Sequence, residues 1–205
     1  MIQKTLEMAL SENYPMILIF TTVLITIRIV YLIVHKEKFV FHKEMTMLAF
    51  LLYALLLFYV VTFQDMNYGT NNFVPFKEIF RYEIGSSVFM HNIIGNIVLF
   101  IPFGYFVSHI MKSRKPYALL IVSIITSLVI EYTQLLIGRT FDVDDIILNV
   151  VGSLFGFLLY FLIDLFQRHT PPFFSSDLFK NILIIVAIVI LGFIYTNYTL
   201  GGFVK

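Results

Sequence analysis

The stretch EYTQLLIGRTFDVDDIILN, residues 131–149, decides how the chain is interpreted. It carries one Glu, one Arg and three Asp, and long apolar segments flank it on both sides. Charged side chains are unfavourable inside a bilayer, so they usually face a protein interior or a wet cavity and often mark a functional site. We therefore expect the rest of the chain to bring further polar residues to this stretch.

The composition identifies the class of protein. The chain has 205 residues, of which 59% are hydrophobic and 13% are charged. A soluble domain of this size cannot bury so much apolar surface, so the composition predicts an integral membrane protein. The net charge of +1 gives no general attraction to nucleic acid, and the absence of Cys excludes disulfides and thiolate metal sites.

Six segments are long and apolar enough to span a membrane, which takes about 20 residues in a helix. They are residues 14–34, 45–63, 92–111, 117–137, 146–166 and 180–198. The predicted fold is therefore an all-α membrane protein, a bundle of about six transmembrane helices that forms a single integral membrane domain over residues 1–205.

The distribution of Lys and Arg predicts the orientation. One side of the predicted bundle carries nine of them and the other side carries five. The nine are Arg28, Lys36, Lys38, Lys43, Lys112, Arg114, Lys115, Arg168 and Lys180, and the five are Lys4, Lys77, Arg81, Arg139 and Lys205. Because cytoplasmic loops are enriched in Lys and Arg, both termini and the 64–91 and 138–145 connections are expected outside the cell.

The outer 64–91 connection contains a short amphipathic or re-entrant segment, FVPFKEIF, at residues 73–80. Pro75 can begin a helical turn. The Phe side chains can enter the lipid boundary while Lys77 and Glu78 stay in water. Two interpretations remain open: an interfacial turn that plugs the bundle, or a lid over an outward-facing site.

Polar residues recur at helical spacing in two predicted spans. In the third span, Asn92 and Asn96 lie one turn apart. In the fourth, a polar stripe follows one face of an otherwise apolar helix. This stripe consists of Ser123, Ser127, Glu131 and Gln134. Amides in membrane helices often serve only to bind a neighbouring helix, so both a packing role and a site are possible.

The fifth span also carries polar and small residues three or four positions apart. Asp142, Asp145 and Asn149 share a face with Gly152 and Gly156. The two glycines predict close approach of another helix. Asp142 is placed to cap the N-terminus of this helix, where negative charge is favoured.

Several ordered blocks between residues 70 and 157 resemble the VanZ-like family of bacterial membrane proteins, whose named member is associated with teicoplanin resistance. The resemblance rests on three blocks: NNFVPFKEI, HNIIGNIVLFIPFG, and EYTQ followed by GRTFDVDDIILNVVGSLFG. It implies a VanZ-like core at 70–157, an additional N-terminal transmembrane helix within 1–44, a C-terminal transmembrane helix within 180–205, and a multi-pass protein of the bacterial plasma membrane. The matched residues are Asn72, Pro75, Phe76, Asn92, Asn96, Pro102, Gly104, Glu131, Gln134, Arg139, Asp142, Asp144, Asp145, Asn149 and Gly152.

We expect an outward-facing polar pocket with ligand-binding residues from these blocks. They are Asn72, Pro75, Phe76, Asn92, Asn96, Glu131, Gln134, Arg139, Asp142, Asp144, Asp145 and Asn149. The resemblance implies an envelope protein that alters access of a teicoplanin-type glycopeptide to the cell surface or to a lipid-linked envelope component. The expected partners are membrane lipids, lipid-linked envelope precursors or a lipoglycopeptide, with no nucleic acid, no cofactor and no resident metal.

Three alternatives stay open from the residues themselves. One is a membrane enzyme that acts on a lipid-linked intermediate, with paired carboxylates as acid and base or as ligands of a divalent cation. Glu131, Asp142 and Asp145 are the candidate catalytic residues. Another is a proton-coupled transporter or flippase. The last is a buried ion network that only fixes helix register.

Overall fold

The structure is a computed structural model that describes residues 2–63 and 70–203. The described residues form helices, and Asn72 and Asp142 make one isolated β-bridge. The helices are α1 (Ile2–His35), α2 (Phe41–Phe63), α3 (Ser87–Phe89), the π-helical turn η1 (Met90–Ile94), α4 (Gly95–Met111), α5 (Pro116–Leu136), α6 (Val143–His169), α7 (Pro172–Ser175) and α8 (Asp177–Phe203). The first part of the predicted outer segment, residues 64–69, lies outside this description.

Among the described residues, five helical segments are long and apolar enough to cross a membrane. They are Leu18–His35, Phe41–Val60, Ser87–Met111, Pro116–Leu136 and Val143–His169. The chain is therefore an all-α, multi-pass membrane protein, as the composition predicts. The predicted sixth span, 180–198, lies within α8, where part of the side chains are outside the description, and it stays a prediction.

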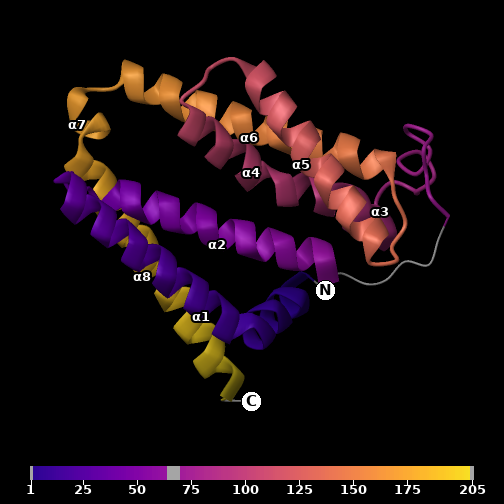
Figure 1. Ribbon diagram of the computed structural model, residues 1–205, viewed down its shortest axis with the longest axis horizontal. Helices are drawn as coiled ribbons and strands as arrows, with labels where there is room; N and C mark the ends of the chain where they lie inside the picture. The colour runs from indigo at the N-terminus through magenta and orange to yellow at the C-terminus, as the bar shows by residue number, and fades with distance from the viewer. Residues whose placement is uncertain (1, 64–69, 204–205) are drawn as a thin grey trace. The chain divides into compact units, whose positions relative to one another are not determined.

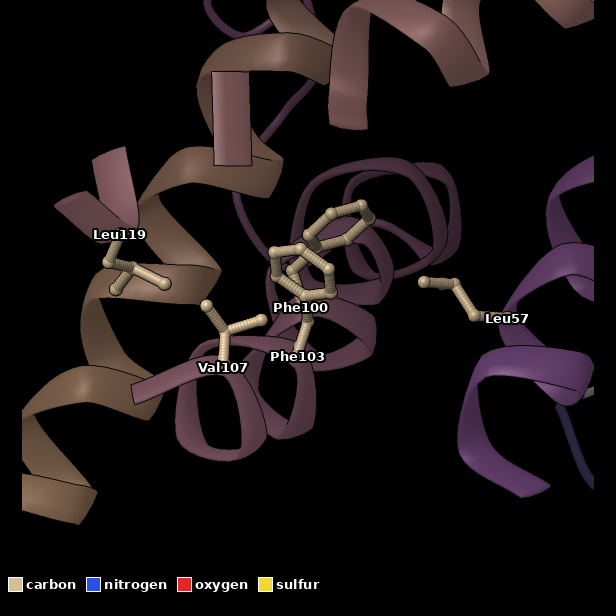
Figure 2. Packing of buried hydrophobic residues seen from close by; sticks show 5 residues of the cluster. All are labelled: Leu57, Phe100, Phe103, Val107 and Leu119. Atoms are coloured by element: carbon tan, nitrogen blue, oxygen red, sulfur yellow. The ribbon is translucent and has the colours of Figure 1, made fainter. Parts of the chain in front are cut away.

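The chain divides into two compact units, and the first comprises Met1–Ile19 and Leu51–Ile163. Within this unit α4, α5 and α6 lie side by side (Figure 1). Its apolar core contains five buried side chains from α2, α4 and α5: Leu57, Phe100, Phe103, Val107 and Leu119. Figure 2 shows the three α4 side chains between Leu119 and Leu57, and the rings of Phe100 and Phe103 are 5.4 Å apart.

Glycines allow α4 and α6 to pack with their backbones almost in contact. A Cβ atom added to Gly152 would lie 2.2 Å from the carbonyl oxygen of Ile97, and one added to Gly156 would lie 2.0 Å from that of Ile101. On α4, a Cβ at Gly104 would lie 2.0 Å from the carbonyl oxygen of Ser153. The predicted close approach at Gly152 and Gly156 is confirmed, and α4 is the partner helix.

The second unit comprises Phe20–Phe50 and Asp164–Lys205. Arg28 donates two hydrogen bonds to the Glu44 carboxylate, at 2.9 and 3.0 Å, and so joins α1 to α2. The backbone N–H of His42 donates to Oδ1 of Asn181 at 2.8 Å, which joins α2 to α8. Most described side chains of α1 from Leu18 onward and of α8 are exposed and apolar, as expected for surfaces that face lipid. The α2 side chains of this unit are mostly half-buried.

The segment before α3 consists of consecutive turns over residues 75–81 rather than a regular amphipathic helix. Phe76 has a positive φ of 67°, which a continuous α-helix does not accommodate. Large apolar side chains of this segment are nevertheless exposed: Phe73 at 68%, Phe80 at 82% and Ile84 at 87%. This pattern agrees with an interfacial segment, whose apolar side chains face the lipid boundary.

Candidate functional site

One face of α5 is polar and buried. Ser123 and Ser127 have no exposed surface, Glu131 is 1% exposed and Gln134 is 7% exposed. Tyr132, next to Glu131 but on another face of the helix, is 61% exposed. The predicted polar stripe is therefore confirmed, and it points into the protein rather than toward lipid.

Asp142 caps the N-terminus of α6, as predicted. Its Oδ1 accepts the backbone N–H of Asp144 at 2.9 Å, which satisfies one of the free donors at the start of the helix. The same oxygen accepts the side-chain amide of Asn72 at 2.8 Å. Burial raises the pKa of Asp142 above its usual value, because the charged form loses hydration.

The chain before α3 is hydrogen-bonded to the start of α6. The backbone N–H of Asn72 donates to the carbonyl of Phe141 at 2.8 Å, and the N–H of Val143 donates to the carbonyl of Asn72 at 3.0 Å. Asn72 itself is only 4% exposed. These bonds place the 72–82 segment next to the carboxylates of α6.

Asp144 holds the backbone of the same segment. Its Oδ1 accepts the N–H of Phe76, and its Oδ2 accepts the N–H groups of Glu78 and Ile79 at 2.7 and 3.2 Å. The side chain is 1% exposed. A carboxylate with three backbone donors is well satisfied when buried, so Asp144 anchors the segment.

Hydrogen bonds accepted by carboxylates connect the helices. Oε2 of Glu131 on α5 accepts the backbone N–H of Asp142 at 2.9 Å. Oδ1 of Asp145 on α6 accepts the side-chain amide of Asn96 on α4. Glu131 therefore links α5 to the residue that precedes α6, and Asp145 links α6 to α4.

A cavity of about 410 Å³ lies among these groups, within the first unit. Its wall combines carboxylates and amides with a smaller number of apolar side chains. The described lining residues are Glu78, Tyr82, Ser87, Val88, His91, Asn92, Ile93, Asn96, Leu99, Phe100, Ile130, Glu131, Gln134, Arg139, Thr140, Asp142, Asp144, Asp145, Leu148 and Asn149. Its volume lies within the range of small-molecule sites, and its lining is more polar than that of most such sites.

Most residues that the sequence suggests for ligand binding line this cavity. They are Asn92, Asn96, Glu131, Gln134, Arg139, Asp142, Asp144, Asp145 and Asn149. Three suggested residues are not among its described lining: Asn72 is buried against Asp142, whereas Pro75 and Phe76 are exposed. Contact between a ligand and any of these residues stays a prediction.

The sequence interpretation missed two lining residues of the 72–82 segment. The sequence predicts that Glu78 stays in water at the membrane boundary, and Tyr82 is not among the residues that it suggests for the site. The side-chain amide of Asn92 donates to the Tyr82 hydroxyl at 3.2 Å, and burial raises the pKa of Tyr82. The backbone contacts of Asp144 bring these side chains to the cavity, and no local pattern in the sequence predicts such contacts.

The helix that carries Asn92 is also irregular. The N–H of Gly95 donates to the carbonyl of Met90, five residues earlier, which makes Met90–Ile94 a π-helical turn. Such turns are rare in proteins, and those that occur are often found at functional sites. His91, in the same turn, lines the cavity too.

The described residues contain no group of three or more His, Cys, Asp or Glu side chains with a geometry that could hold a metal ion. The carboxylates of the cavity instead accept hydrogen bonds from backbone and amide donors.

Comparisons with known proteins identify the family. Neither the curated proteins nor the solved structures contain a match to the chain. The family model described as VanZ/LLP1 matches residues 50–167, which include α4, α5, nearly all of α6 and the whole described lining of the cavity. Because this match covers more than half of the sequence, the chain belongs to the VanZ/LLP1 family.

Proposed function

We propose that this VanZ-type membrane protein binds the polar head group of a membrane-anchored envelope molecule in the cavity between α4, α5 and α6. The observation that carries the proposal is the contrast between the two surfaces of these helices. Their outer faces are apolar and exposed, whereas the cavity of about 410 Å³ is lined mainly by polar side chains, among them five carboxylates and four amides. A ligand with an apolar chain and a polar head matches both environments.

The 72–82 segment supports a ligand that comes from the membrane. It contributes Glu78 and Tyr82 to the cavity and exposes Phe73 and Phe80 on its surface. Exposed apolar side chains beside polar ones are typical of segments at the membrane interface. A head group at the membrane interface would reach the cavity while its apolar chain stays in lipid.

Through such binding the protein would contribute to resistance against teicoplanin-type glycopeptides. In this proposal it alters access of the antibiotic to the surface of the plasma membrane, by occupying either a lipid-linked envelope precursor or the lipoglycopeptide itself. The support is membership of the VanZ/LLP1 family together with the polar cavity.

The test is complementation of a deletion strain with the Glu131→Gln variant. Glu131 is 1% exposed and lines the cavity, and Gln is nearly isosteric with it. We expect the variant to accumulate normally in the membrane but to restore less than a tenth of the protection against teicoplanin, or of whichever envelope defect the deletion causes. Glu83→Gln is the matched control, because Glu83 is exposed and is not among the lining residues, and it should restore full protection.

A fully active and normally abundant Glu131→Gln protein would contradict the proposal. It would leave the polar stripe of α5 as a packing device, in which a buried polar network only fixes the helix register.

An enzymatic role is the second candidate, and one observation favours it. Glu131 and Asp145 both line the cavity, but one accepts a backbone N–H and the other a side-chain amide. Two carboxylates in different surroundings can divide the roles of acid and base. Incubation of the purified protein with lipid-linked envelope precursors, followed by mass spectrometry, distinguishes the candidates: turnover that Glu131→Gln abolishes supports an enzyme.

A further inference from the structure

The charges of the cavity wall are strongly unbalanced. Five carboxylates line it, those of Glu78, Glu131, Asp142, Asp144 and Asp145, and Arg139 is the one Lys or Arg among the described lining residues. Such a wall repels a phosphate and attracts a cation or a hydrogen-bond donor. Acidic residues alone, however, also occur in purely structural networks.

Three of the five carboxylates already have partners. Glu78 forms an ion pair with Arg81 at 3.1 Å, and the other two are used by the fold. Asp144 accepts three backbone N–H groups, and Asp142 caps α6 while it accepts the amide of Asn72. Glu131 and Asp145 are used less: each accepts one hydrogen bond from the described residues. A carboxylate has two oxygens and about four lone-pair sites, so both retain capacity for a ligand.

Asn149 gives independent evidence for a ligand. It lines the cavity and is 4% exposed. Its Nδ2 donates to Oγ of Ser127 at 2.8 Å, while its Oδ1 is buried and has no hydrogen-bond partner among the described residues. Leaving a buried acceptor unsatisfied costs about 1–3 kcal/mol, so such atoms are rare unless a ligand or water completes them.

Building on the proposed function, we infer that the head group carries a primary ammonium, accepted by Glu131, Asp145 and Asn149. An ammonium has three N–H donors and no acceptor, and these three residues supply three acceptors and a net negative charge. Hydrogen bonds between ionised partners are about twice as strong as neutral ones. The described residues form no three-ligand metal geometry, which favours an ammonium over a divalent cation.

The inference is tested with the full-length protein in lipid nanodiscs and three probes that share a dodecyl chain. Dodecylamine carries the ammonium, N-dodecylacetamide lacks the charge, and dodecyltrimethylammonium keeps the charge but has no N–H donor. By calorimetric titration at pH 7 we expect dodecylamine to bind on the order of tenfold more tightly than either of the others.

Two variants assign the binding to this cavity. Glu131→Gln and Asp145→Asn each remove one charge and retain an acceptor oxygen, so each should weaken dodecylamine binding on the order of tenfold, with little change for N-dodecylacetamide. If one of them fails to fold, the other still decides. Glu83→Gln, on an exposed residue outside the lining, should bind like the wild type.

The outcomes separate this inference from the proposed function. Equal affinity for dodecylamine and N-dodecylacetamide, with both weakened by Glu131→Gln, would overturn the ammonium inference and keep the head-group site. Dodecylamine binding that neither variant weakens would overturn the assignment to this cavity. Binding of Ca²⁺ or Mg²⁺ that both variants abolish and that excludes dodecylamine would also overturn it, in favour of a metal site.

Discussion

Asp144 and Glu131 are both acids with 1% of their surface exposed, yet the structure uses them differently. The Asp144 carboxylate accepts three backbone N–H groups from the 76–79 turns, whereas Glu131 accepts one, from Asp142. A carboxylate whose oxygens are filled by the backbone contributes to folding rather than to ligand binding. The two acids should therefore respond differently to the loss of charge.

Asp144→Asn should lower the free energy of unfolding by about 1–3 kcal/mol, because the new Nδ2 group faces backbone donors and leaves at least one unsatisfied. Thermal unfolding in detergent measures the effect. Asp164→Asn is the control: it removes a surface ion pair to Arg168 at 3.2 Å, and such pairs contribute about 0–1 kcal/mol. An Asp144→Asn protein as stable as the wild type would contradict the anchoring role.

The raised pKa of Asp142 predicts that the stability of the protein depends on pH. Burial raises its pKa in the folded state, so the folded protein holds this proton more tightly than the unfolded chain. Wild-type stability therefore falls as the pH rises from the unfolded pKa, about 4, through the raised folded value. Asp142→Asn keeps an acceptor oxygen for Asn72 and the backbone of Asp144 but lacks this titration.

The Tm of Asp142→Asn, measured against the wild type, should therefore increase between pH 4 and pH 7. Differential scanning calorimetry across this range provides the measurement. A Tm difference that stays constant, or that falls with pH, would show that the folded pKa of Asp142 is not raised.

Side chains that follow one helix were predictable, and side chains that depend on distant backbone were not. The spacing of Glu131 and Gln134 placed them on one face of α5, and the structure buries both. The role of Asp144 depends on the N–H groups of residues more than 60 positions earlier. Nothing in the local pattern around Asp144 specifies where those donors lie.

At the scale of elements, the pairing of α4 with α6 fixes one wall of the cavity. Asn96 projects from α4 and Asp145 from α6, and the hydrogen bond between them requires the two backbones to lie close together. Gly104, Gly152 and Gly156 make that approach possible. The close contact of α4 with α6 and the geometry of the cavity are therefore coupled. A change that separates the two helices also separates Asn96 from Asp145.

Gly156→Ala should destabilise the protein by about 1–3 kcal/mol or more, because its Cβ would lie 2.0 Å from the carbonyl oxygen of Ile101, a backbone atom that cannot rotate away. Gly192→Ala on α8 is the matched control, since an added Cβ meets nothing within 4 Å there. Its stability should equal or slightly exceed that of the wild type. Unfolding in SDS titrations measures both, and equal values would contradict the close packing of α4 and α6.

The positions of the helices could largely be predicted, because apolar runs of about 20 residues have few alternative structures in a membrane. The predicted 117–137 span differs from α5 by one residue at each end. The third span was predicted to begin at 92, but the helix begins at Ser87 through α3 and the π-helical turn. The polar residues Ser87 and His91 concealed this beginning, and both line the cavity.

At the scale of the whole molecule, an outward-facing cavity requires a particular orientation of the chain. Nine Lys and Arg on one side against five on the other predict that the 112–115 connection is cytoplasmic and that the 72–91 segment is extracellular. The cavity residues Glu78, Arg139 and Asp142 belong to the extracellular connections or their ends in this arrangement. A head group of the outer leaflet would then have direct access.

Single-cysteine labelling tests this orientation cleanly, because the sequence contains no Cys. Glu83 and Arg114 are both exposed polar residues on opposite predicted sides of the bundle. In intact cells an impermeant maleimide should label the Glu83→Cys variant and should label Arg114→Cys only after permeabilisation. Both variants should react equally in detergent, which controls for the intrinsic reactivity of each thiol. Labelling of Arg114→Cys but not of Glu83→Cys in intact cells would reverse the orientation, place the cavity at the cytoplasmic face and remove the proposed access of an extracellular glycopeptide.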